Sequence, residues 1–218
     1  MAGLQLKKLK YGPPGLVLGE QSIELEMGKL YALTGRNGSG KSSLLRTIAG
    51  LYPSHGGELS LFGENLLKKK PIEIARHIGL VLTKRPDVKG IDVFTLLEMG
   101  RFPHQKVNRK EEEERIITWA SRLQIEQHLQ TPIDHLSDGE FQRVMIARVL
   151  IQETPVILLD EPTAFLDFIA KEEILCLLKQ LAQATPKIVL FSSHDLALVD
   201  QYADQEIRLL DRNEPTSC

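Results

Sequence analysis

The segment that most constrains this chain is GRNGSGKS, residues 35–42, which follows the apolar run LYALT and precedes the apolar-striped helical pattern KSSLLRTIAG. Its glycines allow a tight turn in which successive backbone N–H groups point at one phosphate, and the helix N-terminus adds partial positive charge. Lys41 is expected to reach the β- and γ-phosphates of a nucleotide, and the Ser42 hydroxyl to bind Mg²⁺. The predicted nucleotide-binding residues are Gly35, Arg36, Asn37, Gly38, Ser39, Gly40, Lys41, Ser42 and Ser43.

A second motif supplies the acids that a phosphate loop needs for hydrolysis. In VILLDEP, residues 156–162, four apolar residues precede adjacent carboxylates, so the acids emerge where a buried strand leaves the core. Ligands of open parallel sheets bind at that carboxyl edge. Asp160 is therefore predicted to hold Mg²⁺ through water, and Glu161 to act as general base toward the attacking water.

Strand-like and helix-like segments alternate, which favours an α/β fold. The predicted strands are the short apolar runs at 30–35, 57–63, 77–82, 155–160 and 187–193, and helical periodicity is found at 41–50, 139–152 and 170–184. We find no convincing strand from 86 to 150. There, the segment 108–129 predicts a helix whose acidic run Glu111–Glu114 is expected to be a solvated helix start rather than a metal site. The expected organisation is one domain over residues 1–218, with an α/β core at 1–85 and 151–218 interrupted by a helical subdomain at 86–150.

Composition argues against several classes of protein. The chain has 27 Lys and Arg residues against 29 Asp and Glu residues, and its net charge of −2 gives it no overall attraction for nucleic acid or anionic lipid. Its two cysteines form no CxxC pair or Cys/His cluster, so neither a zinc site nor a disulfide framework is expected, and Cys176 is predicted to lie in the core. No segment has the apolar character of a signal peptide or a membrane span, so a cytoplasmic location is expected.

Taken in order, the motifs resemble those of the nucleotide-binding subunits of ABC transporters over essentially the whole chain. GRNGSGKS resembles Walker A, VILLDEP resembles Walker B with its following glutamate, and LSDGE at 136–140 resembles the LSGGQ signature. FLD, ending at Asp167, resembles the D-loop, SSHD contains the family's switch histidine at His194, and Tyr11 lies where the family places an aromatic residue that stacks on adenine. The resemblance implies ATP and Mg²⁺ as ligands. It also implies a P-loop NTPase (RecA-like) core with a mixed, mainly parallel sheet, an N-terminal antiparallel β portion and an inserted α-helical subdomain.

The role that the resemblance implies for His194 agrees with its position. His194 follows the apolar strand KIVLFS, so it too leaves a strand end near the place expected for a γ-phosphate. An imidazole can hydrogen-bond phosphate, water and carboxylate together. Glu161 and His194 are therefore the predicted catalytic pair.

Two departures from the family pattern are visible. The family has a glutamine at the end of the strand that leads into the helical subdomain, and Thr83 takes this position. Thr83 is a candidate Mg²⁺ ligand through its hydroxyl, although a neighbour such as Lys84 could substitute for the glutamine. In the signature, Asp138 and Glu140 replace a glycine and a glutamine, whereas Ser137 and Gly139 are kept as the groups that would touch the γ-phosphate. Asp138 is expected to point away from that phosphate, because it would otherwise repel it.

The resemblance also implies partners. One phosphate loop and one signature lie too far apart in this fold to grip one nucleotide, so a head-to-tail homodimer is expected, in which Ser137, Asp138, Gly139 and Glu140 meet the ATP of the partner chain. The dimer would bind transmembrane permease subunits on the cytoplasmic side of the cell membrane as a peripheral protein. A substrate-binding protein would be an indirect partner.

The segment FTLLEMGRFPHQ, residues 94–105, resembles the corresponding segment of ATPases that energise uptake of iron-siderophore, haem or cobalamin-type substrates. A soluble ABC ATPase of an assembly machine, such as the iron–sulfur scaffold type, and the ATPase of an exporter remain alternatives. A chromosome protein with a long coiled coil is disfavoured, because the interval between Lys41 and Ser137 is too short for one. A simple nucleotide kinase is disfavoured by LSDGE and SSHD.

Overall fold

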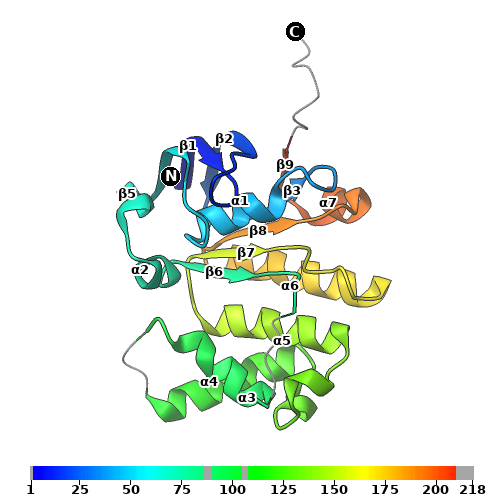
Figure 1. The fold of residues 1–218 in the computed structure, drawn as a ribbon. Coiled ribbons are helices and arrows are strands. Elements are labelled where there is room, and N and C mark those ends of the chain that lie inside the picture. Colours follow the sequence, from blue (N-terminus) through cyan, green and yellow to red (C-terminus); the bar gives the residue numbers. More distant parts are fainter. Residues whose placement is uncertain (1, 86–89, 105–107, 210–218) are drawn as a thin grey trace.

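The computed structural model describes residues 2–85, 90–104 and 108–209 (Figure 1). Residues 86–89 at the start of the expected helical subdomain, Gln105 of the segment 94–105, and Cys218 lie outside the described residues. Within the described ranges, the strands form a five-stranded and a four-stranded sheet. The predicted fold class is confirmed, with the parallel and antiparallel strands in separate sheets.

The five-stranded sheet has the order β6-β7-β8-β3-β9, and its neighbouring strands run parallel. The strands are β6 (Ile78–Val81), β7 (Val156–Leu159), β8 (Ile188–Ser192), β3 (Lys29–Thr34) and β9 (Gln205–Arg208). β7 and β8 are buried along their whole length, as expected for continuous apolar runs covered on both faces. The carboxyl ends of β3, β7 and β8 therefore meet at one edge of the sheet.

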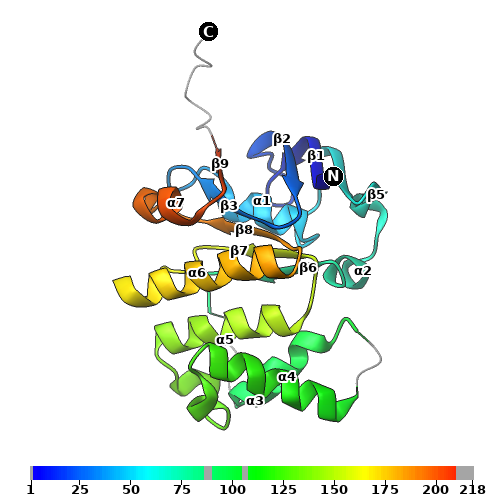
Figure 2. The same ribbon diagram turned by 180° about the vertical axis from the view of Figure 1, so that it is seen from behind.

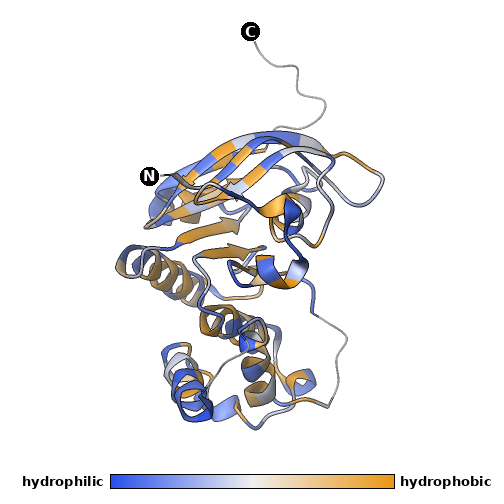
Figure 3. Ribbon diagram, turned by 90° about the vertical axis from the view of Figure 1, so that its left-hand side faces the viewer, coloured by the Kyte–Doolittle hydropathy of each residue, from blue (hydrophilic) through white to orange (hydrophobic). Residues whose placement is uncertain are grey.

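The four-stranded sheet has the order β2-β1-β4-β5 and is antiparallel. Its strands are β2 (Gly19–Glu26), β1 (Ala2–Tyr11), β4 (Gly56–Leu61) and β5 (Glu64–Asn65). Apolar and polar residues alternate along this sheet (Figure 3), and Leu4 and Leu6 of β1 face the core. A register shift between Leu6 and Leu9, with Lys8 at φ 47°, returns Leu9 to the buried face.

Helices cover both faces of the parallel sheet because its strands are apolar on both sides. Tyr31 and Leu33 of β3 share one core with α1 (Lys41–Ile48) and the antiparallel sheet. Leu30 and Ala32 face the opposite side and share the other core with α6 (Phe168–Ala184). Figure 2 shows α6 lying between the parallel sheet and the helices of the segment that connects β6 to β7. The last helix, α7 (Leu196–Tyr202), contacts β3 and α6.

The chain between β6 and β7 is helical in the described residues, apart from an isolated bridge between Asp92 and Pro132. Its elements are α3 (Val93–Glu98), η2 (Met99–Arg101), α4 (Arg109–Arg122), η3 (Glu126–His128), η4 (Ile133–His135) and α5 (Asp138–Ile151). They gather at the end of the molecule away from β1 and β2 (Figure 1). The short elements η1 (Leu66–Lys68) and α2 (Pro71–Ala75) precede β6.

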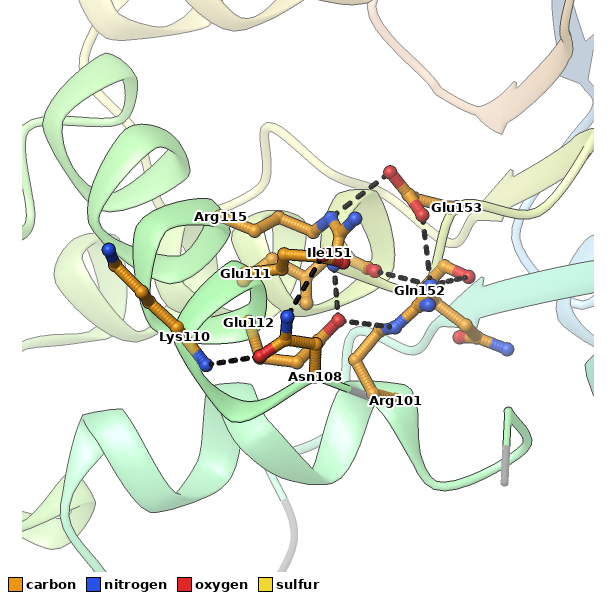
Figure 4. Close-up of polar contacts among 9 residues, drawn as sticks. All are labelled: Arg101, Asn108, Lys110, Glu111, Glu112, Arg115, Ile151, Gln152 and Glu153. Atoms are coloured by element: carbon orange, nitrogen blue, oxygen red, sulfur yellow. Dashed lines mark hydrogen bonds and ion pairs between the residues drawn. The ribbon is translucent and has the colours of Figure 1, made fainter. Parts of the chain in front are cut away.

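One acid of the run Glu111–Glu114 is not solvated as predicted. Glu112 is only 7 % exposed, and its Oε1 lies 3.2 Å from Arg101 Nε and also contacts Arg115 (Figure 4). Glu153, after α5, bridges the same two arginines at 3.0 and 3.1 Å. The run therefore lies at the start of α4 as predicted, and the ion pair between Glu112 and Arg101 connects α4 to η2. Among the described residues, no group of three or more Asp, Glu, His or Cys side chains is placed to hold a metal ion.

The prediction that Cys176 lies in the core is wrong, because its side chain is exposed. The buried face of α6 carries Ile174, Leu175 and Leu178, and Cys176 lies outside this stripe. Its Sγ instead accepts a hydrogen bond of 3.4 Å from Gln180 Nε2. Apolar spacing located the helix correctly, but it did not distinguish the edge of the stripe from its centre.

Candidate nucleotide site at the edge of the parallel sheet

The phosphate loop connects the end of β3 to the start of α1. Gly35 and Gly40 have φ values of 144° and 97°, a region that favours glycine, and Gly40 directly precedes the helix. The side chain of Lys41 folds back over the loop, and its Nζ donates hydrogen bonds to the carbonyls of Gly35 at 2.7 Å and Arg36 at 3.2 Å. This arrangement holds a positive charge inside the curve of the loop, where a phosphate would bind.

Ser39 provides a test of whether the loop fits a phosphate. Its Oγ is buried and has no hydrogen-bond partner among the described residues. A Cβ atom placed on Gly35 would lie 2.8 Å from this oxygen, so a side chain at position 35 would crowd it. A buried hydroxyl without a partner is costly. An anion in the loop would satisfy it, so the loop fits the phosphates of a nucleotide.

The Ser42 hydroxyl and the Asp160 carboxylate meet across two elements. Ser42 Oγ, in the first turn of α1, donates a hydrogen bond of 2.9 Å to Asp160 Oδ1 at the end of β7. Ser192 Oγ, at the end of β8, donates another of 2.9 Å to the same oxygen. Asp160 is buried, so these hydroxyls compensate part of the cost of removing its charge from water. A hydroxyl and a carboxylate side by side are the oxygen ligands that Mg²⁺ prefers.

Glu161 follows Asp160 in a strained backbone conformation. Its φ of 48° is unusual for a non-glycine residue and costs about 1–3 kcal/mol. Its N–H donates a 2.9 Å hydrogen bond to Ser192 Oγ, which helps to hold this conformation. Burial raises the pKa of the Glu161 carboxyl, whereas the neighbouring His194 and Lys41 act to lower it. A base with a raised pKa binds a proton more strongly than an ordinary carboxylate does.

His194 completes the site from the end of β8. Its Nδ1 lies 3.0 Å from Glu161 Oε2, so the structure brings the predicted catalytic pair together. A cavity of about 670 Å³ opens beside them and is lined by Gly35, Arg36, Asn37, Ser193 and His194, among other residues. The open space therefore lies at the carboxyl ends of β3 and β8, where ligands of parallel sheets bind.

Thr83 lies near Asp160, the predicted metal-binding acid, but contacts its backbone. The Thr83 hydroxyl donates a hydrogen bond of 2.8 Å to the carbonyl of Asp160, and the Asp160 N–H donates one of 2.9 Å to the carbonyl of Val81. The hydroxyl proton is thus already used. Thr83 positions Asp160, and its role as a metal ligand stays a prediction.

Tyr11 has a different environment from the one that the resemblance implies. Only 2 % of it is exposed, and it belongs to the core shared by α1 and the antiparallel sheet. A Cβ on Gly40 would lie 2.9 Å from its Cε2, and one on Gly19 would lie 2.6 Å from its hydroxyl. In this conformation the ring offers no free face to adenine, because it packs beneath the phosphate loop.

The signature residues begin α5, on the other side of the parallel sheet from α1. Ser137 is the N-cap of α5. Its Oγ accepts from the Glu140 N–H at 3.3 Å, and its own N–H and hydroxyl donate to Glu140 Oε2 at 2.8 and 2.7 Å. Ser137 and Glu140 thus form a capping box, and these hydrogen bonds lower the pKa of the Glu140 carboxyl. This explains why a glutamate is tolerated at the last signature position.

The other signature residues contact two neighbouring segments. Asp138 Oδ1 lies 3.5 Å from Arg85 Nη1. Gly139 faces the D-loop segment, since a Cβ there would lie 3.5 Å from the Phe165 carbonyl and from Leu166 Cδ2. Asp167 is the N-cap of α6 and accepts a hydrogen bond of 2.9 Å from the Ala170 N–H. The signature and the D-loop therefore lie side by side in one chain.

Two residues of the site were not identified from the sequence. Ser192 joins Asp160 to Glu161, and its only signal was its position at the end of an apolar strand, as the first residue of SSHD. Arg85 reaches the signature from the segment that follows β6, and nothing in its local pattern indicated that contact. Tertiary contacts between distant segments create both roles.

The phosphate loop, the Ser42–Asp160 pair and their position at the carboxyl edge of the parallel sheet define a P-loop nucleotide-binding protein. A family model described as ABC transporter matches residues 18–164 of the chain. The chain belongs to the ABC transporter family.

Known proteins similar to this chain include ATP-binding subunits of transport systems. The chain is 37% identical over 200 residues to the achromobactin transport ATP-binding protein of Dickeya dadantii, with 90% of this chain and 74% of that protein covered. It is 36% identical over 214 residues to the iron(3+)-hydroxamate import ATP-binding protein of Bacillus subtilis, with 96% and 79% covered. The dimeric structure of a bacterial ABC transporter cassette has a TM-score of 0.85 at 25% identity and covers 94% of each chain.

Proposed function

We propose that this protein binds ATP with Mg²⁺, hydrolyses it to ADP and phosphate, and thereby energises transport through separate membrane subunits. The observation that carries the proposal is the convergence of Ser42, Asp160 and Ser192 beside the Glu161–His194 pair, directly next to the phosphate loop. A phosphate-binding loop alone would support nucleotide binding. A partly buried carboxylate that contacts a histidine at the same edge supports hydrolysis.

Each group has a defined task in this proposal. Lys41 and the loop N–H groups hold the phosphates, and Ser42 and Asp160 would hold Mg²⁺, which when bound would supply positive charge to the phosphates. Glu161 accepts a proton from the water that attacks the γ-phosphorus, and the bond to the β–γ bridging oxygen breaks to release ADP. His194 orients Glu161 and can donate a hydrogen bond to the γ-phosphate.

We further propose that two copies pair head to tail. Because α1 and α5 lie on opposite sides of the parallel sheet, the signature faces away from its own phosphate loop. A two-fold arrangement would place Ser137 and Gly139 of each copy against the nucleotide of the other. The likeness to a dimeric cassette supports this arrangement. In this assembly, the segment 86–150 acts as a helical signature subdomain and 1–85 with 151–218 as the ATP-binding core.

A groove between α2, β6 and η2 supports docking of a membrane partner. It has a volume of about 560 Å³ and a mainly apolar lining that includes Leu51, Met99 and Phe102. These three side chains are exposed, Phe102 to 79 %. Exposed apolar side chains gathered at one groove indicate an interaction site. No helix of the described ranges is both long and apolar enough to cross a bilayer. We therefore propose a peripheral protein that binds permease subunits through this groove on the cytoplasmic side of the membrane.

The substrate class is proposed from the relatives. A relative in Bacillus subtilis is described as an iron(3+)-hydroxamate import ATP-binding protein. The segment that resembles the iron-chelate, haem and cobalamin importers includes α3 and η2, next to the proposed docking groove. We therefore propose that the permease imports an iron-siderophore, haem or cobalamin-type substrate, delivered by a substrate-binding protein.

The variant Glu161→Gln tests the proposal, with Glu113→Gln on the exposed face of α4 as the matched control. Because a glutamine cannot accept the proton, Mg²⁺-dependent ATP hydrolysis should fall by about 10²-fold or more, and ATP should hold the variant as a dimer in light-scattering chromatography. Glu113→Gln should behave like the parent protein. Unchanged turnover in Glu161→Gln would contradict the assigned base, and co-purification with a soluble scaffold instead of a polytopic permease would contradict the transport role.

A further inference from the structure

The two departures from the family pattern are joined by one short segment. Thr83 stands in place of a glutamine, Asp138 stands in place of a glycine, and Arg85, two residues after Thr83, contacts Asp138. The segment that follows β6 therefore touches the metal-binding acid at one end and the signature at the other.

At the ATP-binding core, the segment is held by the backbone of Asp160. The Asp160 N–H donates to Val81 at 2.9 Å, and the Asp160 carbonyl accepts from the Thr83 hydroxyl at 2.8 Å. Both bonds involve the residue that would help to hold Mg²⁺. A displacement of Asp160 on nucleotide binding would therefore move the end of β6 with it.

At the signature, the guanidinium of Arg85 makes four contacts. Nη1 donates a hydrogen bond of 3.1 Å to the Leu136 carbonyl, and Nη2 donates to the Ile133 carbonyl. The guanidinium carbon lies 4.5 Å from the centre of the Phe141 ring, and Nη1 is 3.5 Å from Asp138. These groups lie on both sides of Ser137, so Arg85 fixes the turn that presents the serine.

The Arg85–Asp138 ion pair contributes little to the stability of the fold. Asp138 is 65 % exposed, and exposed ion pairs stabilise proteins weakly. Its charge matters more for a ligand, because an unpaired carboxylate at the signature would repel the phosphates of a second copy's ATP. Arg85 places a positive charge beside that carboxylate, and two backbone carbonyls and the Phe141 ring hold its guanidinium in place.

We propose that Arg85 is a positioning residue that links Asp160 to the signature turn, and that it neutralises Asp138 so that Ser137 and Gly139 can meet the ATP of a second copy. The pair Thr83 and Arg85 would thereby take over the connection that the family's glutamine provides. This inference rests on the proposed head-to-tail dimer. In this inference, Arg85 affects dimerisation and does not affect the binding of nucleotide by a single chain.

The experiment measures ATP-dependent dimerisation in the Glu161→Gln background by light scattering over a range of protein concentrations. The variants are Arg85→Ala, Arg85→Lys, Asp138→Asn and the combination Arg85→Ala with Asp138→Asn. Arg122→Ala is the matched control, because Arg122 also stacks on a ring of the helical region, Trp119 at 5.1 Å, away from the signature. Binding of a fluorescent ATP analogue to the monomer and thermal melting are measured on every variant.

Arg85→Ala should weaken the dimer about tenfold while nucleotide binding by the monomer stays within about twofold. Addition of Asp138→Asn should recover part of that loss, because it removes the unpaired charge. Arg85→Lys keeps the positive charge but lacks the planar guanidinium, so its dimer affinity should lie between those of Arg85→Ala and the parent. A purely structural role would give no recovery in the combined variant, and that result would overturn the inference, as would normal dimerisation of Arg85→Ala. Absence of an ATP-dependent dimer in Glu161→Gln alone would instead contradict the proposed function.

Discussion

The imidazole Nδ1 of His194 lies 3.0 Å from Oε2 of Glu161, and the two side chains differ sharply in exposure. Glu161 is 17 % exposed and His194 is 67 % exposed, so the histidine covers the acid on the solvent side. Burial raises the pKa of Glu161, and the charge and hydrogen bond of His194 oppose that rise. The protonation state of the proposed base therefore depends on this contact.

We expect His194→Ala to move the acidic limb of the ATPase pH profile to higher pH. The substitution removes an influence that lowers the pKa of Glu161, so the pKa of this carboxyl rises further. A general base works only when deprotonated, so activity is lost as pH falls through its pKa. Turnover at saturating Mg-ATP, measured across pH, checks this expectation. His135→Ala, an exposed histidine 4.0 Å from Asp134, is the control and should leave the limb in place. A lower plateau with an unmoved limb would mean that His194 acts on the phosphate alone.

Ser192→Ala should impair both activity and stability. The substitution leaves the Glu161 N–H without its acceptor and takes one donor from Asp160. A buried donor without a partner costs about 1–3 kcal/mol in the free energy of unfolding, which urea titration measures. The strained backbone of Glu161 also loses support, so turnover should fall about tenfold or more. Ser22→Ala, which removes an acceptor of the Lys8 N–H on the exposed sheet, should change neither value much. A Ser192→Ala variant with normal turnover would show that other contacts maintain the strained backbone conformation of Glu161.

Tyr11→Ala should destabilise the protein by about 3–5 kcal/mol, the usual cost of deleting a buried aromatic side chain. The ring packs against the backbone of Gly40 and Gly19, so its loss leaves a cavity beneath the phosphate loop. Urea titration gives the stability, and fluorescent ATP-analogue binding below the transition gives the affinity. Tyr11→Phe keeps the ring and should retain most of both. If Tyr11→Ala lost nucleotide affinity with unchanged stability, the ring would instead stack on adenine after a rearrangement.

The sequence predicted the positions of the phosphate loop and of the adjacent acids, because each is formed by consecutive residues. The loop ending at Ser42 and the acids Asp160 and Glu161 each follow directly on a strand. Apolar runs and turn residues in the local sequence predict such a strand and its end. Tyr11 and Arg85 show what local sequence patterns do not report. Their environments are made by segments far away in the chain, such as Gly40 beside Tyr11 and Asp138 beside Arg85. The spacing of residues along the sequence does not reveal contacts between segments that are far apart in the chain.

The last prediction concerns the Ser137 hydroxyl, which the proposed dimer would present to the ATP of the second copy. Ser137 Oγ donates to Glu140 Oε2 at 2.7 Å, so the carboxylate competes with a γ-phosphate for the same proton. Glu140→Gln removes the charge and keeps a side-chain acceptor for the capping box. We therefore expect a tighter ATP-dependent dimer in the Glu161→Gln background, by about three- to tenfold. Glu173→Gln, whose carboxylate pairs with Arg143 away from the signature, is the control and should have no effect. A weaker dimer in Glu140→Gln would mean that the carboxylate holds Ser137 in its working orientation.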